Sequence, residues 1–173
     1  MMRMLKYLLI LIAIAALVVF VVGYRLPEQH TASGEREYAA APGRVFGEIA
    51  NPGEYARWRS GVQRVEMLPP DSTGRTRFRE ISLSDEITYE IEQQIPDRLF
   101  VTRIADENLP YGGTWTFELE PTQTGTLVRI TEDGEVRNPI FRFVSRYVMG
   151  HTRGINKYLD DLDERLRATS AAP

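Results

Sequence analysis

The chain has 173 residues, no cysteine and two histidines, so disulfides, cysteine nucleophiles and a classical zinc site are not expected. Its formal net charge is −3; subtracting Arg3 and Lys6 at the N-terminus from the 21 Lys and Arg leaves 19 against 24 Asp and Glu, about −5. Such an acidic surface repels phosphate backbones, so we expect no nucleic-acid partner, and we expect neither a metal site nor a cofactor.

The segment Tyr7–Tyr24 near the N-terminus is an uncharged hydrophobic run, YLLILIAIAALVVFVVGY. At a rise of about 1.5 Å per residue, a helix of about 18 residues nearly crosses a hydrocarbon core about 30 Å thick. Tyrosines stand at both ends of the run, where the amphipathic ring prefers the membrane interface. The segment predicts an N-terminal transmembrane helix within residues 1–25 that anchors the chain.

A cleavable signal peptide is the alternative interpretation, because Arg3 and Lys6 form a basic region before the apolar run. The sequence after Val22 contains no small-x-small cleavage site, which favours the uncleaved anchor. Only Arg25 follows the run directly. The positive-inside rule therefore places the N-terminus in the cytoplasm and the rest of the chain in a periplasm or outside the cell.

Residues 26–31 are mostly polar and contain a proline, which predicts a short linker in which His30 is solvated. A first strand is expected at Thr31–Ala39. The stretch APGRVFGEIA then predicts a short helix that begins near Pro42, with its apolar residues on one face. The Asn-Pro pair at residues 51–52 predicts the N-cap and first position of a second short helix.

From residue 62 onwards the hydrophobic pattern alternates with a period of two, which predicts six further strands separated by turn sequences. In the fifth of these, Trp115, Phe117 and Leu119 alternate with polar residues, which is typical of an antiparallel sheet covered on one face. The six expected strands are Val62–Leu68, Arg75–Leu83, Glu86–Ile95, Leu99–Ile104, Thr114–Glu120 and Thr126–Val136.

A long helix predicted over residues 138–168 is the expected cover of this sheet. Gly150 and Gly154 each lower helix propensity by about 1 kcal/mol, so we expect a kink or a close contact between them. Residues 169–173 are expected to fray, which leaves a single domain over residues 32–168. The inward stripe of the helix consists of Ile140, Val144, Tyr147, His151, Ile155, Tyr158, Leu162 and Leu166.

Several stretches of the chain match one family: APGRVFGEIANPGEYARW, VQRVEML, GRTRFRE, ITYEIEQQIPDRLFVTRIADENLPYGGTWTFELEP, GTLVRITEDGEVRNPIFRFVSRYVMGH and INKYLDDLDERL. In these segments the chain resembles the START-like SRPBCC superfamily, and within it bacterial polyketide cyclase/dehydrase-like proteins. The resemblance implies an α+β helix-grip fold: a curved seven-stranded antiparallel sheet around a long C-terminal helix, with two short helices after strand 1. It also implies a hydrophobic cavity between sheet and helix that holds a lipid, a polyketide or another apolar small molecule.

His151 lies on the inward stripe of the predicted helix and is a candidate general acid or base, since the pKa of histidine lies near physiological pH. The alternative is a structural histidine that bonds a backbone carbonyl or a hydroxyl. Strand parity also places Glu80, Arg103 and Glu132 on the apolar face of the sheet. We expect these groups to form a buried acid-base cluster with His151, unless a bulge or a strand end interrupts the alternation.

Two other groups of residues are candidates for binding. Arg142, Arg146 and Arg153 fall on the opposite side of the helix and are expected to be solvated; the alternative is contact with lipid headgroups. The loop LPYGG, which contains Tyr111, is either a mobile mouth or a plain turn. The candidate ligand-binding residues, several of which core packing explains equally well, are Trp58, Phe78, Glu80, Tyr89, Arg103, Trp115, Phe117, Glu132, Tyr147 and His151.

The sequence contains no phosphate loop, nucleophile elbow, zinc-protease helix or dinucleotide fingerprint. The expected function is therefore non-enzymatic: a membrane-tethered domain that binds an apolar small molecule. One alternative is a cyclase/dehydratase-type enzyme in which His151 moves a proton while Arg103 or a tyrosine hydroxyl steadies an enolate. Another is a protein-interaction module at the membrane. The sequence identifies neither the ligand nor a protein partner.

Overall fold

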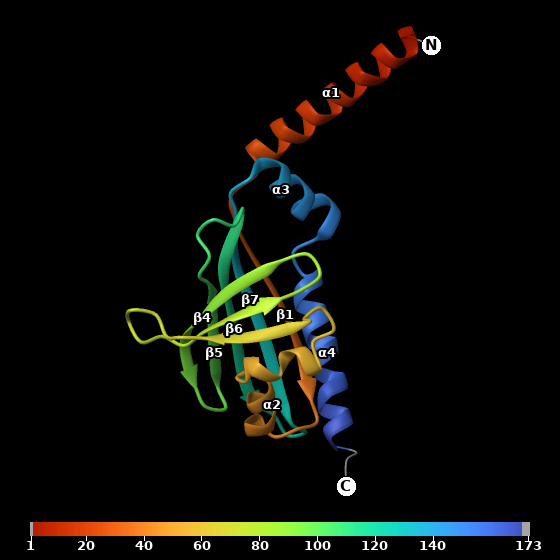
Figure 1. The fold of residues 1–173 in the computed structure, drawn as a ribbon. Coiled ribbons are helices and arrows are strands. Elements are labelled where there is room, and N and C mark those ends of the chain that lie inside the picture. Colours follow the sequence, from red (N-terminus) through yellow and green to blue (C-terminus); the bar gives the residue numbers. More distant parts are fainter. Residues whose placement is uncertain (1, 171–173) are drawn as a thin grey trace.

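The computed structural model describes residues 2–170 (Figure 1). Within this range the chain forms one seven-stranded sheet with helices at its N-terminus, after the first strand and at its C-terminus. The helices are α1 (Met2–Arg25), α2 (Pro42–Ile49), the 3-10 helix η1 (Pro52–Arg57), α3 (Pro139–Val144), the π-helical turn η2 (Ser145–Met149) and α4 (Arg153–Ser170). The strands are β1 (Gln29–Tyr38), β2 (Arg64–Leu68), β3 (Arg77–Ile81), β4 (Glu86–Ile95), β5 (Leu99–Ile104), β6 (Tyr111–Pro121) and β7 (Thr126–Val136).

The sheet runs in the order β1-β7-β6-β5-β4-β3-β2, and every neighbouring pair is antiparallel. The first strand therefore returns to pair with the last one, while the strands between them follow one another as a meander. Helix α4 lies along one face of this sheet (Figure 1). The α+β helix-grip fold expected from the sequence is confirmed.

The core lies between the sheet and α4. Ile155, Leu159 and Leu162 of α4 are fully buried against apolar residues of the sheet. Gly34 in β1 permits this contact, because a Cβ atom there would lie 2.9 Å from Cγ2 of Ile155. The short helix α2 closes one end of the core with Val45, Phe46 and Ile49. On the sheet, the core side chains are Ala32, Tyr38, Phe100, Phe117, Leu119, Val128 and Ile130.

The C-terminal helix is interrupted at residues 150–152, within the stretch where a kink or a close contact was predicted, but the interruption divides the expected helix over residues 138–168 into separate segments. Asn138 caps α3 as expected, since its Oδ1 accepts hydrogen bonds from the backbone N–H groups of Ile140 and Phe141. The helix ends after the π-helical turn η2, where Gly150 adopts a left-handed conformation with φ of 73°. Only α4 covers the sheet, whereas α3 lies at the end of α1 (Figure 1).

Two boundaries differ from the sequence interpretation in ways that affect the site. Strand β1 begins at Gln29, so His30 belongs to the sheet and is not a solvated linker residue. Strand β6 begins at Tyr111, so this part of the LPYGG stretch is strand rather than loop. At the C-terminus α4 continues to Ser170, beyond the point where fraying was expected, and residues 171–173 lie outside the described part of the chain.

Helix α1 is long and apolar enough to cross a membrane, and its most apolar stretch is not buried against the domain. A signal sequence near an N-terminus satisfies the same criteria of length and composition. The end of α1 is nevertheless joined closely to the domain, because a Cβ atom at Gly23 would collide with the carbonyl oxygen of Pro139. The first helix and the start of α3 therefore meet without intervening side chains.

Candidate functional site

The space between the sheet and α4 is almost filled by side chains. Its cavity has a volume of about 40 Å³. Pockets that hold drug-sized ligands have volumes of about 300–1,000 Å³, so this interior has no room for such a molecule without rearrangement. The cavity is lined by Tyr55, Arg59, Phe78, Glu80, Tyr89, Thr102, Trp115, Phe117 and Tyr158.

A largely buried ion pair occupies the centre of this interior. Arg59 donates a hydrogen bond to Glu80, and the two side chains are 22% and 12% exposed. The guanidinium carbon of Arg59 lies 4.8 Å from the ring centre of Tyr55 and 4.9 Å from that of Tyr158. Both tyrosine rings therefore hold the cation by cation–π contacts. Glu80 faces inward as strand parity predicted, but it neutralises Arg59 instead of joining His151.

The aromatic candidates from the sequence come together around this ion pair. Phe78 stacks on Tyr89 with ring centres 5.3 Å apart, and Phe117 lies 5.1 Å from Tyr158. Trp58 makes an edge contact with Tyr158 at 5.3 Å. The sequence analysis did not identify Arg59 or Tyr55 as site residues. Their spacing of four residues, which brings side chains together on one face of a helix, could have indicated this contact.

A second group of side chains joins β1, β7 and the turn that precedes α4. The imidazole rings of His30 and His151 stack with centres 3.9 Å apart, and Oε1 of Glu132 lies 3.7 Å from Nε2 of His30. Gly134 makes room for the first ring, since a Cβ atom there would collide with the imidazole of His30. Glu132 therefore faces this site, but its contact is with His30, which the sequence did not reveal, whereas the prediction named His151. We call His30, Glu132 and His151 the histidine cluster.

Burial shifts all three members of the histidine cluster toward their neutral forms. Burial raises the pKa of Glu132 to about 7, although a hydrogen bond from Trp115 acts in the opposite direction. Burial lowers the pKa of His30, and the neighbouring His151 lowers it further. Burial and the charge of Arg146 lower the pKa of His151. Near neutral pH Glu132 can therefore exchange a proton, whereas burial favours the neutral forms of both imidazoles.

An open pocket lies beside the histidine cluster, where α1 meets the domain. Its volume is about 320 Å³, within the range of small-molecule sites. We call it the junction pocket. It is bounded by the linker after α1, the beginning of β1, the end of β7 and the α3–η2 segment, and is lined by Leu26, Pro27, Glu28, Gln29, His30, Thr31, Val136, Arg142, Ser145, Arg146 and His151.

Arg142 is not part of a solvated face, which corrects the sequence interpretation. Its side chain is 8% exposed and forms an ion pair with Glu28, with Nη2 2.7 Å from Oε1. It also donates hydrogen bonds to the carbonyl oxygens of Leu26 at 3.0 Å and Arg137 at 2.9 Å. The helical period predicted that Arg142 is exposed because it assumed one continuous helix. In the structure α3 is separate from α4 and packs against the end of α1. Arg142 thus fixes the linker beneath α3.

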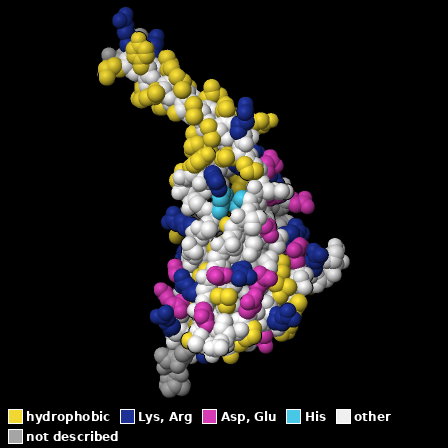
Figure 2. All heavy atoms as spheres, turned by 180° about the vertical axis from the view of Figure 1, so that it is seen from behind, with side chains coloured by type: hydrophobic (Ala, Val, Ile, Leu, Met, Phe, Trp, Pro, Cys, Tyr) yellow, Lys and Arg dark blue, Asp and Glu magenta, His cyan; other side chains and the backbone are white. Residues whose placement is uncertain are grey.

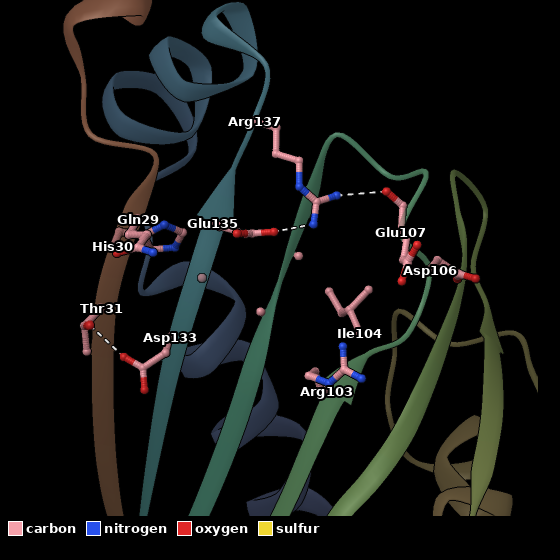
Figure 3. A pocket seen from close by; sticks show the side chains of 13 residues that line it. Gln29, His30, Thr31, Arg103, Ile104, Asp106, Glu107, Asp133, Glu135 and Arg137 are labelled. Atoms are coloured by element: carbon pink, nitrogen blue, oxygen red, sulfur yellow. Dashed lines mark hydrogen bonds and ion pairs between the residues drawn. The ribbon is translucent and has the colours of Figure 1, made fainter. Parts of the chain in front are cut away.

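Arg103 also lies elsewhere than predicted, on the outer face of the sheet. Its guanidinium bonds Glu90 at 2.7 Å and Glu92 at 2.9 Å, and its side chain is 42% exposed. Three consecutive residues before it, Phe100 to Thr102, are all buried, so alternation gave the wrong parity. Arg103 lines an outer-face depression of about 460 Å³. In this depression Arg137 bonds Glu135 and the backbone of Glu107 (Figure 3).

The four members of the expected acid-base cluster, Glu80, Arg103, Glu132 and His151, therefore lie in three places, with Arg103 on the outer face. Glu80 belongs to the ion pair in the interior, and Glu132 belongs to the histidine cluster. Trp115 connects them, because it lines the interior cavity and also hydrogen-bonds Glu132. Tyr147, another predicted site residue, is exposed and contacts Phe143 in a tilted arrangement with ring centres 5.1 Å apart.

The comparisons agree with this architecture. A family model described as polyketide cyclase/dehydrase and lipid transport matches residues 29–169. The chain belongs to this family. The region matched by the polyketide cyclase/dehydrase and lipid transport family runs from the start of β1 to the last turn of α4. It therefore contains the whole sheet and all three residues of the histidine cluster. This family match supports the resemblance to the START-like SRPBCC superfamily that the sequence predicted. A search of curated proteins gave no match.

Solved structures with the same fold share little sequence with this family member. A START superfamily protein from Mycobacterium smegmatis is 14% identical, with a TM-score of 0.64 over 81% of this chain and 99% of that one. A protein from Thermus thermophilus is 23% identical, with a TM-score of 0.64 over 82% and 100% of the two chains. The di-domain ARO/CYC StfQ of the steffimycin biosynthetic pathway is 10% identical, with a TM-score of 0.66 over 83% of this chain and 52% of that one. At these identities the likeness shows the fold alone.

Proposed function

We propose that the protein binds a hydrophobic or amphipathic small molecule at the junction pocket while α1 tethers it to a membrane. The position of the pocket carries this proposal: a volume of about 320 Å³ lies where an apolar helix meets the domain. The interior site expected from the fold is closed around Arg59 and Glu80, with a cavity of about 40 Å³. The description of the family as polyketide cyclase/dehydrase and lipid transport agrees with an apolar ligand.

The lining of the junction pocket suits a molecule with one polar end. Leu26, Pro27 and Val136 supply apolar surface, while His30 and His151 offer neutral imidazole groups. A ligand carbonyl or carboxyl group at this place can accept hydrogen bonds from these groups, and the apolar part of the ligand can extend toward α1.

Native mass spectrometry of the full-length protein, released from membranes in mild detergent, tests the binding. We expect a co-purified apolar molecule, and we expect Ser145→Trp to reduce its occupancy about tenfold or more by filling the pocket. Ser145 lines the pocket, and Ser84→Trp in the exposed β3–β4 turn is the matched control that should keep wild-type occupancy. Protein that is empty across lipid classes, or a ligand indifferent to Ser145→Trp, contradicts the proposal.

A proton-transferring cyclase or dehydratase is the second candidate, and the histidine cluster is the observation that favours it. Stacked imidazoles next to a carboxyl group with a pKa of about 7 form an acid-base set that can act on a ligand in the junction pocket. Arg103 has no part in this version, because it lies on the outer face of the sheet.

Substitution of His151 tests this second candidate. If the cluster is catalytic, His151→Ala should lower kcat for any detected turnover about 10²- to 10⁴-fold, as expected for loss of a general acid or base. Binding measured by native mass spectrometry should change much less. Turnover that survives His151→Ala intact rules out His151 as the catalytic acid or base.

A further inference from the structure

The α3–η2 segment (Pro139–Met149) carries a concentration of exposed apolar side chains next to the end of α1. Ile140, Phe141, Tyr147, Val148 and Met149 are between 49% and 69% exposed. Exposed large hydrophobic residues of this density on one short segment indicate an interaction surface. The feature stands apart from the core, which is formed by α4, α2 and the sheet.

The position of this segment relative to α1 is fixed by close contacts. The carbonyl oxygen of Pro139 lies so near Gly23 that any side chain there would collide with it. Arg142 of α3 donates hydrogen bonds to the carbonyl oxygens of Leu26 at 3.0 Å and Gly23 at 3.5 Å. Helix α3 is therefore held at the point where α1 leaves the domain, and Figure 2 shows hydrophobic side chains along α1 that reach this end of the domain.

We propose that the α3–η2 segment is a second membrane contact, whose exposed apolar side chains enter the lipid surface beside α1. This inference rests on the membrane tether of the proposed function. It assigns the partner as a lipid bilayer because the exposed residues continue the apolar surface of α1. The same end of the domain also carries side chains of the types that are common at a membrane–water interface. These are Tyr24 and Arg25 at the end of α1 and Arg146 on η2, and all three are exposed.

The pattern of exposure also favours lipid over a protein groove. A helix that docks into a groove presents a stripe of residues three and four positions apart. Here Tyr147, Val148 and Met149 are consecutive and all exposed, so they project in different directions around the π-helical turn. Fluid lipid can surround all three side chains, whereas one groove can receive only part of them.

The contact has a consequence for the junction pocket. Arg142, Ser145 and Arg146 of the same segment line that pocket. With η2 in the lipid surface, the rim of the pocket lies at the bilayer, and an amphipathic ligand can pass between lipid and pocket without crossing water.

Single-cysteine labelling tests the contact, and the native chain has no cysteine to interfere. Val148→Cys probes η2, Ile12→Cys probes α1, and Leu83→Cys, at a position 91% exposed in the β3–β4 turn, is the control. Full-length protein labelled with an environment-sensitive fluorophore is reconstituted into phosphatidylcholine vesicles with a minority of phosphatidylglycerol, with and without doxyl-labelled lipid. We expect the probes at residues 12 and 148 to be quenched roughly twofold and the probe at residue 83 to be unaffected.

The outcomes separate this inference from the tether itself. Quenching at residue 12 without quenching at residue 148 overturns the second contact and leaves the tether intact. A blue-shifted probe at residue 148 that lipid does not quench also overturns it, because the segment is then buried in a protein contact. Absence of quenching at both positions removes the tether from the proposed function. Met149→Cys provides a second position on η2 if Val148→Cys does not fold.

Discussion

Glu80→Gln should destabilise the domain by about 3 kcal/mol, because it leaves Arg59 charged and largely buried without its counter-ion. The substitution keeps the shape of the side chain, so packing against Phe78 and Tyr89 changes little. The Arg59 guanidinium remains between Tyr55 and Tyr158, and cation–π contacts of about 1–2 kcal/mol do not replace a carboxylate. Urea denaturation of the full-length protein in detergent, followed by fluorescence of Trp58 and Trp115, measures the loss.

Glu35→Gln is the matched control for this experiment. Glu35 pairs with Arg129 across β1 and β7 at 3.1 Å, but both side chains are well exposed. Its loss should cost less than about 1 kcal/mol. The double variant Glu80→Leu/Arg59→Met should be more stable than Glu80→Gln and should recover most of the loss. It replaces the ion pair by two apolar side chains of similar volume and leaves no buried charge.

The size of the Glu80→Gln effect also bears on where a ligand binds. A loss as small as that of Glu35→Gln means that water solvates Arg59 in the native state. The interior is then open often enough to admit a molecule between the sheet and α4. In that case the small size of the interior cavity no longer favours the junction pocket as the binding site. A loss of about 3 kcal/mol means that the interior is closed around the ion pair.

Local patterns of the sequence predict the sheet well. Strand alternation between residues 62 and 136 identifies six strands in the correct order, because each has one face on the core and the other in solvent. Alternation fails for Arg103, where Phe100 to Thr102 are buried in succession and parity cannot distinguish the two faces. It succeeds for Glu132, since Val128 and Ile130 before it are buried on the same face.

The parts that were not predicted depend on contacts between distant segments. The helical period continues from Ile140 to Leu166, so nothing local in that period separates α3 from α4. The division arises because α3 packs on α1, and Gly150 permits the turn. His30 joins His151 for the same reason: β1 pairs with β7 at a register that places His30 opposite Gly134. The local sequence of β1 does not show which residues of β7, about 100 positions later in the chain, will lie opposite it.

Glu132→Gln should stabilise the folded protein above neutral pH, by at most about 3 kcal/mol. The pKa of Glu132 is about 7 in the folded state against an ordinary value of 4.5. Between these values the folded state holds a proton that the unfolded state has released, so stability falls as pH rises from 4.5 to 7. Glutamine cannot ionise and avoids this loss, and the two proteins should be equally stable below the ordinary pKa of the carboxyl group.

Denaturation of both proteins across this pH range, with Glu118→Gln at an exposed position of β6 as control, measures the difference. His30 and His151 act in the opposite direction, because their lowered pKa values make stability fall as pH decreases below 6.5. Both proteins contain the two histidines, so the histidine contribution to the pH dependence of stability largely cancels in the difference between wild type and Glu132→Gln. Should Glu132→Gln instead lower stability at high pH, the ionised carboxylate of Glu132 stabilises the fold beside the neutral imidazole of His30, and the cluster is structural. If it raises stability while abolishing ligand binding or turnover, the carboxyl group is kept beside the two histidines at a cost in stability, as expected of a functional site.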